Sequence, residues 1–290
     1  MVTLESAKRI EVRREGLKKI ATYIFLTVCC VSMVVPFLWM VSTSLKEPTA
    51  VFTYTFEFIP RPIVWDSYIK IWKLAHVPFL RFYINSIFVA CCVTAGQVIT
   101  SSLAAYAFAR LKFPGRDKIF FAYLATMMIP GSVTIVPLYA LMKVMGWIDT
   151  YKALIIPAMF TAYGTFMLRQ FFMTLPRDLE DAAKMDGCGL FGVYWRIILP
   201  LSQPALATLT TFVFLGNWAS FMWPLLVTNS AEMKTLPIGL AYFQEIYRHA
   251  QPDWSLLMAG STLVMLPLIL IFIFNQKFFI EGIKLTGIKG

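Results

Sequence analysis

The sequence predicts an all-α, polytopic membrane protein with six transmembrane helices and both termini in the cytoplasm. Of its 290 residues, 58% are apolar and only 14% are charged, whereas a soluble domain has about 45–50% apolar and about 25% charged residues. This composition excludes a soluble single domain and also a disordered chain, whose signature is low hydrophobicity. Long uncharged runs and the placement of basic residues support the same conclusion.

Six apolar runs can cross a membrane as helices. A spanning helix needs about 20 residues, and in lipid only helices and closed barrels satisfy the backbone. The fourth run reaches this length if Arg169 extends its charge to the membrane surface. Pro130 and Gly131 predict a local break in the third run. The expected spans are about 20–42, 82–109, 119–142, 151–172, 202–227 and 255–277.

The basic residues set the orientation. With the amino terminus inside, seventeen Lys and Arg residues lie in cytoplasmic segments and nine lie outside, as the positive-inside rule requires. The expected domains are a cytoplasmic leader 1–19 that touches anionic lipid, a transmembrane domain 20–280 that includes the cytoplasmic loop 173–200, and a cytoplasmic tail 281–290. Because topology accounts for most of the net charge of +10, we expect no nucleic-acid partner.

The sequence lacks the motifs of common catalytic sites. It has no G-x-x-x-x-G-K-[ST], H-E-x-x-H or G-x-S-x-G, so we expect no phosphate-binding loop, no catalytic residue and no enzyme activity in this chain. Five cysteines without metal-ligand spacing and the two histidines, His76 and His249, predict no metal site. The first run is longer than a signal-peptide core and lacks its cleavage site, so it is expected to remain as a span.

The residues alone leave two functions open, an ATP-independent transporter or channel and an intramembrane enzyme. An ATP-independent secondary transporter or channel would need buried acids or repeated short spans, and no carboxylate lies in the middle of a predicted span. An intramembrane enzyme would need polar groups within spans. Such groups more often join helices by hydrogen bonds; the candidates are Thr94, Gln97, Thr100, Ser101, Ser102 and Asn217.

The predicted cytoplasmic loop 173–200 differs from a simple connector. Thr174 is expected to cap a helix with Pro176 in its first turn, and acidic residues follow where the helix dipole favours them. Gly187 and Gly189 are expected to end this helix. A second amphipathic stretch, 190–199, is expected to end at Pro200. A docking surface for another protein and a loop lying on lipid both fit this pattern.

One motif in this loop resembles a known signature. Asp181-Ala182-Ala183 is followed at fixed spacing by Gly187, Ile197 and Leu199-Pro200. This is similar to the E-A-A-x₃-G-x₉-I-x-L-P signature of ABC-importer permeases, with Asp181 in the place of Glu. Segments 85–116, 127–157, 235–240 and 281–290 also resemble the carbohydrate-uptake branch. The ending resembles that of the shorter permease subunit of maltose-type importers.

The resemblance implies a complex in the bacterial inner membrane that imports a sugar or oligosaccharide by alternating access. Its partners would be a second homologous permease, two ATP-binding subunits that hold ATP and magnesium, and an extracytoplasmic sugar-binding protein. This chain itself would hold no cofactor. The residues implied to dock on the ATP-binding subunits are Asp181, Ala182, Ala183, Asp186, Gly187, Ile197, Leu199 and Pro200. A tryptophan at Ala183 is therefore expected to clash with the ATPase cleft.

The resemblance also suggests where substrate could pass. In the fifth span the family usually has Trp-Asn followed by an acidic residue, and this chain has Asn217, Trp218 and Ser220 in that region. We take these three as candidate substrate-pathway residues. The outer segment 228–254 is expected to face the binding protein, and Lys289 in the tail is expected to react only from the cytoplasmic side. The sugar itself stays open.

Overall fold

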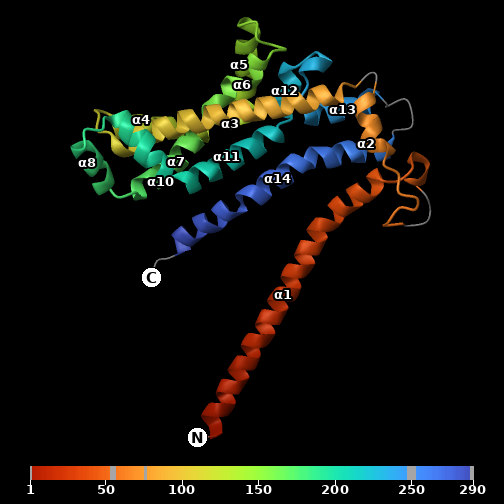
Figure 1. Cartoon of the computed structure of the whole chain (residues 1–290), viewed down its shortest axis with the longest axis horizontal. Helices are drawn as coiled ribbons and strands as arrows, with labels where there is room; N and C mark the ends of the chain where they lie inside the picture. Colours follow the sequence, from red (N-terminus) through yellow and green to blue (C-terminus); the bar gives the residue numbers. More distant parts are fainter. Residues whose placement is uncertain (1, 53–56, 75–76, 247–252, 288–290) are drawn as a thin grey trace. The chain divides into compact units, whose positions relative to one another are not determined.

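The computed structural model describes residues 2–52, 57–74, 77–246 and 253–287 (Figure 1). These residues form helices and connecting turns, and none of them is in a β-strand, which confirms the all-α prediction. His76 and His249 lie outside the described residues, as do residues 288–290 of the predicted tail with Lys289. The chain divides into two compact units, Met1–Ile71 with Gln251–Thr262, and Trp72–Ala250 with Leu263–Gly290.

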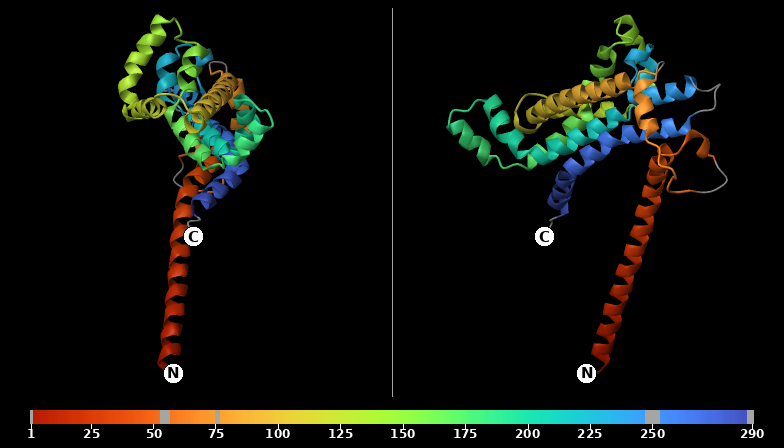
Figure 2. Two further views of the ribbon diagram at one scale, coloured as in Figure 1. Left: turned by 90° about the vertical axis from the view of Figure 1, so that its left-hand side faces the viewer. Right: turned by 45° about the vertical axis from the view of Figure 1, so that its right-hand side comes forward.

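The first unit contains one long helix. Helix α1 runs without interruption over Val2–Ser44 and includes Pro36, as its continuous ribbon shows (Figure 2). The predicted leader is thus a helix continuous with the first predicted span. A short helix, α2 (Asp66–Lys70), packs near its end, where Ser44 Oγ and Tyr68 Oη share a hydrogen bond of 2.7 Å. The start of α14 (Trp254–Gly287) also belongs to this unit.

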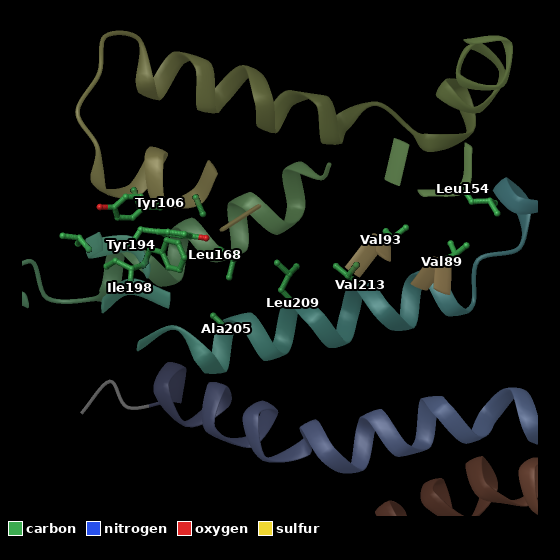
Figure 3. Close-up of a cluster of buried hydrophobic side chains, with 14 of the residues drawn as sticks. Val89, Val93, Tyr106, Leu154, Leu168, Tyr194, Ile198, Ala205, Leu209 and Val213 are labelled. Atoms are coloured by element: carbon green, nitrogen blue, oxygen red, sulfur yellow. The ribbon is translucent and has the colours of Figure 1, made fainter. Parts of the chain in front are cut away.

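The second unit is built around helix α3 (Phe79–Arg110), which packs along α7 (Ala162–Thr174) and α11 (Gln203–Trp218). Its buried core includes Val93, Leu168 and Leu209, none of which is exposed (Figure 3). The other helices of this unit are α4 (Arg116–Ala125), α5 (Gly131–Val144), α6 (Tyr151–Ile155), α8 (Asp178–Met185), α9 (Leu190–Val193), α10 (Leu199–Leu201), α12 (Met222–Val227), α13 (Leu236–Ile246) and the remainder of α14.

Helices α3 and α7 approach closely at a glycine. A Cβ atom at Gly164 would lie 2.5 Å from Ser101 Oγ and 3.1 Å from Ser101 Cβ. Small residues at such crossings let two backbones come together, which is how membrane helices gain packing energy in the absence of a hydrophobic driving force. Ser101, one of the polar residues in the second predicted span, is therefore a packing residue in this structure.

Polar side chains of α3 also stabilise a break in the fourth predicted span. Between α6 and α7 the chain passes through a short 3-10 turn, Pro157–Met159, and an extended residue, Phe160. Carbonyl groups at such a break lose their helical partners. Gln97 Nε2 donates to the carbonyl of Ala158, and Thr100 Oγ1 donates to that of Met159 at 2.8 Å.

A second pair of side chains covers a proline kink in α14. Pro267 has no N–H, so the carbonyl of Leu263 four residues earlier loses its helical partner. Tyr83 Oη donates to this carbonyl at 3.3 Å, and Trp218 Nε1 donates to the next one, Val264, at 3.0 Å. The two rings also contact edge to face, with centroids 5.8 Å apart. Proline is tolerated because neighbouring helices replace the lost hydrogen bonds.

Three helical segments are long and apolar enough to cross a membrane, Arg14–Ser44, Phe79–Arg110 and Trp254–Gln276. Two bent pairs qualify if each counts as one span. Arg116–Met128 and Gly131–Val144 bend by 97° at Pro130, where the sequence predicts a break, and Leu190–Leu201 and Gln203–Trp218 bend by 79°. The expected fourth span, 151–172, is divided at Pro157, and the fifth, 202–227, is interrupted at 219–221. Length and composition thus support up to five spans among the described residues.

Candidate functional site

The loop 173–200 contains a short helix with a defined end. Helix α8 places Asp178, Glu180 and Asp181 in its first turn, where carboxylates favour the positive end of the helix dipole. Gly187 has φ +82°, which only glycine adopts without strain. Gly187 N–H donates to Lys184 O at 3.0 Å, and Cys188 N–H donates to Ala183 O at 2.9 Å. This pair of bonds is the Schellman motif that ends a helix.

Two details of the loop differ from the sequence prediction. Thr174 does not cap α8; it is the last residue of α7, and its hydroxyl donates to Phe171 O at 2.7 Å. Pro176 accordingly precedes α8 instead of lying in its first turn. The second stretch also continues past Pro200 to Leu201, through a π-helical turn at Tyr194–Ile198 in which Leu199 N–H donates to Tyr194 O. The chain bends after Leu201.

A buried ion pair anchors α8 to the core. Arg110 Nε at the end of α3 lies 3.0 Å from Glu180 Oε1, and the two side chains are only 3% and 7% exposed. The same guanidinium donates to the carbonyls of Phe172 and Leu175, the latter at 2.7 Å. One arginine therefore joins α3, the end of α7 and α8. Such a network holds the helix in a fixed place because each buried charge has partners.

Only one of the two alanines expected to dock lies on the exposed side of α8. Asp181 and Ala182 face solvent, and Met185 is 88% exposed. Asp181 also pairs with Lys184 at 3.1 Å. Ala183, by contrast, is 8% exposed and belongs to the hydrophobic core of this chain. The clash predicted for a tryptophan at Ala183 would therefore occur inside the chain, and an approaching partner would meet Ala182 instead.

The remaining predicted docking residues fall into two groups. Asp186 and Gly187 are exposed at the end of α8. Ile197 and Leu199 are half-buried and pack against the core, and Pro200 is exposed. The structure therefore brings Asp181, Ala182, Asp186 and Gly187 together on one turn and its cap. The later members of the motif lie on the helix that leads back to α11.

A second feature is a cavity of about 240 Å³ near the opposite end of α11. Asn217 and Ser220, two of the three candidate pathway residues, line it together with Trp223 and Thr235. Trp218 does not line it. That side chain is 1% exposed and covers the kink in α14. The structure thus places two of the three candidates at one cavity and the third in the packing between helices.

The segment 228–236 beside this cavity is held by a polar network. Asn85 is fully buried, donates to the carbonyls of Glu232 and Lys234 at 2.7 and 2.9 Å, and accepts from Tyr151 Oη at 2.6 Å. Asp149 Oδ1 accepts from the N–H groups of Asn229 and Ser230 at 2.9 and 3.1 Å. Neither anchor is predicted by the sequence pattern.

The charge of Asp149 follows from these contacts. Burial alone would raise the pKa of the Asp149 carboxyl, but the hydrogen bonds from Asn229 and Ser230 outweigh it and hold the pKa below its ordinary value. Asp149 also has φ +62°, a backbone conformation that asparagine and aspartate adopt more readily than most residues. The carboxylate therefore stays charged at neutral pH and keeps both acceptor bonds.

Comparison with known proteins decides the family. Residues 97–284 match the family described as binding-protein-dependent transport system inner membrane component. The chain belongs to this family. It is a permease subunit of an ABC importer and a protein of the inner membrane. The matched region includes α8 and its glycine cap, the second part of α3 from residue 97 onward, and nine of the eleven residues that line the cavity next to α11.

Individual relatives agree with this assignment. The permease is 34% identical over 259 residues to the arabinooligosaccharides transport system permease protein AraQ of Halalkalibacterium halodurans, which covers 89% of this chain and 91% of the relative. It is 37% identical over 231 residues to the AraQ protein of Bacillus subtilis, covering 80% and 81% of the two chains. Identity to the sn-glycerol-3-phosphate transport system permease protein UgpE of Yersinia enterocolitica is 34% over 247 residues, covering 84% and 87%.

A solved structure shares the fold. A chain of a bacterial ABC transporter involved in the import of the acidic polysaccharide alginate superimposes with a TM-score of 0.83. The match covers 92% of this permease and 98% of that chain at 22% sequence identity. The helix arrangement is therefore that of an ABC-importer permease.

Proposed function

We propose that this permease imports a carbohydrate and forms the transport pathway together with a second, homologous permease subunit. Two ATP-binding subunits would hold ATP and magnesium, and an extracytoplasmic sugar-binding protein would deliver the substrate. The names of the AraQ relatives, which refer to arabinooligosaccharides, favour a sugar. A second solved structure, of a bacterial alginate ABC transporter with an alginate pentasaccharide-bound periplasmic protein, is consistent with such partners.

The proposed topology has six spans and cytoplasmic termini. The bent and divided helices of this chain suit it, because a break at membrane depth is tolerated where protein surrounds it. Gln97 and Thr100 provide such surroundings at the break between α6 and α7. The loop 173–200 and the end of α14 would then lie on the cytoplasmic side, and the segment 228–236 would lie outside.

The way in which α8 is exposed on one side and attached on the other supports a role in coupling the ATP-binding subunits to the membrane domain. Its exposed turn presents Asp181, Ala182 and Met185, while Glu180 on the opposite side is fixed to Arg110. A helix transmits force from a partner to the membrane domain only if its attachment is stiff. The buried ion pair and the glycine cap provide that attachment at the two ends of α8. Movement of an ATP-binding subunit would then displace α3 and α7 as rigid bodies.

The test is co-purification followed by transport. The permease should be isolated with ATP-binding subunits and a second permease, and vesicles containing the complex should take up sugar only when ATP is hydrolysed. Uptake that continues at the same rate with a non-hydrolysable ATP analogue would contradict the proposal and favour an ATP-independent transporter.

A further inference from the structure

The cavity beside α11 has the composition of a binding site for an uncharged polar ligand. Eleven described residues line it, and none of them carries a charge. Four have polar side chains, Ser86, Asn217, Ser220 and Thr235, and Trp223 adds an aromatic ring. Small-molecule sites commonly combine apolar walls with a few placed polar groups. A volume of about 240 Å³ is below the roughly 300–1,000 Å³ of pockets for drug-sized ligands and suits a single sugar ring.

One polar group in this cavity lacks a partner. The hydroxyl of Thr235 is buried and makes no hydrogen bond with any described residue, although the residue is only 5% exposed. An unpaired buried hydroxyl costs free energy, so rotation of the Thr235 side chain toward a ligand that supplies a partner is favoured. Ser86 Oγ accepts from the N–H of Leu236 at 2.7 Å, which leaves its own proton free to be donated.

The other polar groups are held in place by the protein. Asn217 Nδ2 donates to Val213 O at 2.8 Å, which fixes the amide and leaves its oxygen as an acceptor. Trp223 Nε1 donates to Ala153 O at 3.0 Å and so fixes the indole ring. A ligand that fits this arrangement needs hydroxyl groups that both donate and accept, together with an apolar face to contact the indole. A sugar ring has both features.

The lack of charge distinguishes among substrates. A phosphate or a uronate bound in the cavity needs a cation to offset the water that it loses, because an unpaired desolvated charge is costly. Lys234, next to Thr235 in the chain, does not supply one to the cavity. Its Nζ lies 5.1 Å from the centre of the Tyr242 ring and 3.5 Å from the carbonyl of Asn229, and Lys234 is absent from the cavity lining.

We propose that this cavity binds one ring of a neutral sugar during transport, and that it disfavours phosphorylated and acidic substrates. The inference rests on the proposed import function and narrows its substrate class. It also implies that this permease contacts the substrate directly, through Ser86, Asn217, Ser220, Trp223 and Thr235.

A matched pair of variants at Thr235 tests the direct contact. Thr235→Val keeps the volume and removes the hydroxyl, whereas Thr235→Ser keeps the hydroxyl. The complete transporter should be assayed in vesicles with whichever neutral trisaccharide of arabinose, glucose or galactose supports uptake. We expect the KM for uptake to rise about three- to tenfold in Thr235→Val, the effect of one lost hydrogen bond, and to stay near the wild-type value in Thr235→Ser.

A protection experiment tests the substrate class. Ser220→Cys, in a chain whose five native cysteines are replaced by alanine, should react with N-ethylmaleimide in the assembled complex. The neutral trisaccharide that supports uptake, at millimolar concentration, should slow the reaction severalfold, while sn-glycerol 3-phosphate and a mannuronate trisaccharide should not. Protection by either anion, or no protection by the neutral trisaccharide, would contradict the inference.

The two proposals fail in different ways. A complex that imports sugar with ATP hydrolysis, but whose Thr235→Val and Thr235→Ser variants have the same KM, contradicts the neutral-sugar site and leaves the import function standing. A wild-type complex without ATP-dependent uptake of any of the trisaccharides contradicts the proposed function itself and, with it, the site.

Discussion

Arg110 at the end of α3 and Glu180 in the first turn of α8 form an ion pair of 3.0 Å that is almost entirely buried. The pair connects the helix at the centre of the membrane core to the helix that we propose docks on an ATP-binding subunit. Arg110 also bonds to the carbonyls of Phe172 and Leu175. These contacts attach the start of the loop 173–200 and helix α8 to the core through one side chain.

Breaking this pair should destabilise the permease strongly. Glu180→Met alone leaves the Arg110 charge buried, and Arg110→Met alone leaves that of Glu180, a loss of about 3–5 kcal/mol in comparable pairs. The double variant removes both charges and should recover much of this loss. Thermal unfolding of the purified complex measures the effect. If the two single losses simply add in the double variant, the pair does not act as a unit.

The cap of α8 should be sensitive to the residue at position 187. Gly187→Val places a β-branched side chain at φ +82°, which is strained, whereas Gly187→Asn adopts such a conformation more readily. We expect uptake to fall severalfold in Gly187→Val, with binding of the ATP-binding subunits at least partly kept. Gly187→Asn is the matched control and should transport close to the wild-type rate. Equal uptake by both variants would contradict the role of the cap.

Most of the helices could be predicted from the sequence, but few of the side-chain contacts that hold them together could. Long runs without charge predict helices, and Pro130 predicts the break between α4 and α5. Gly187 predicts the end of α8 because one residue determines the turn. Ala183, however, differs from Ala182 only in the direction that α8 turns it, and that direction depends on Glu180 reaching Arg110, seventy residues away in the chain.

The same limit applies to the polar contacts around the cavity. Trp218 and Ser220 are two residues apart, yet one covers a proline kink and the other lines the cavity. Of the three residues Arg110, Asn85 and Asp149, Arg110 alone is marked by its neighbours in the sequence, because it is a charged residue at the end of a long uncharged run. Asn85 and Asp149 are not marked in this way, and their partners lie in a segment far along the sequence.

The segment 228–230 should depend on the carboxylate of Asp149. Asp149→Gly tolerates φ +62° but removes the acceptor for Asn229 and Ser230, whereas Asp149→Asn tolerates the same backbone and keeps an acceptor oxygen. If this segment meets the binding protein, Asp149→Gly should raise the concentration of loaded binding protein that half-stimulates ATP hydrolysis. Asp149→Asn should behave like the wild type. The same half-stimulating concentration in all three proteins would exclude a positioning role.

The close contact between α3 and α7 should leave no room for a methyl group at position 164. In Gly164→Ala the added Cβ would lie 2.5 Å from Ser101 Oγ, and overpacking of this kind costs about 1–3 kcal/mol. Combining it with Ser101→Gly removes the opposing side chain and should restore part of the stability. Thermal unfolding of the purified complex again measures the change, and a Gly164→Ala protein as stable as the wild type would contradict the close approach.

If the exposed turn of α8 receives an ATP-binding subunit, as we propose, a bulky side chain at Ala182 should prevent docking. Ala182→Trp adds bulk on the exposed side without touching the core around Ala183, and Ala182→Ser adds only a hydroxyl. The measurement is the amount of ATP-binding subunit that co-purifies with each variant, together with uptake by the same complexes. We expect Ala182→Trp to lose both while remaining folded, and Ala182→Ser to keep both. Retention of the ATP-binding subunit and normal uptake in Ala182→Trp would contradict the proposal.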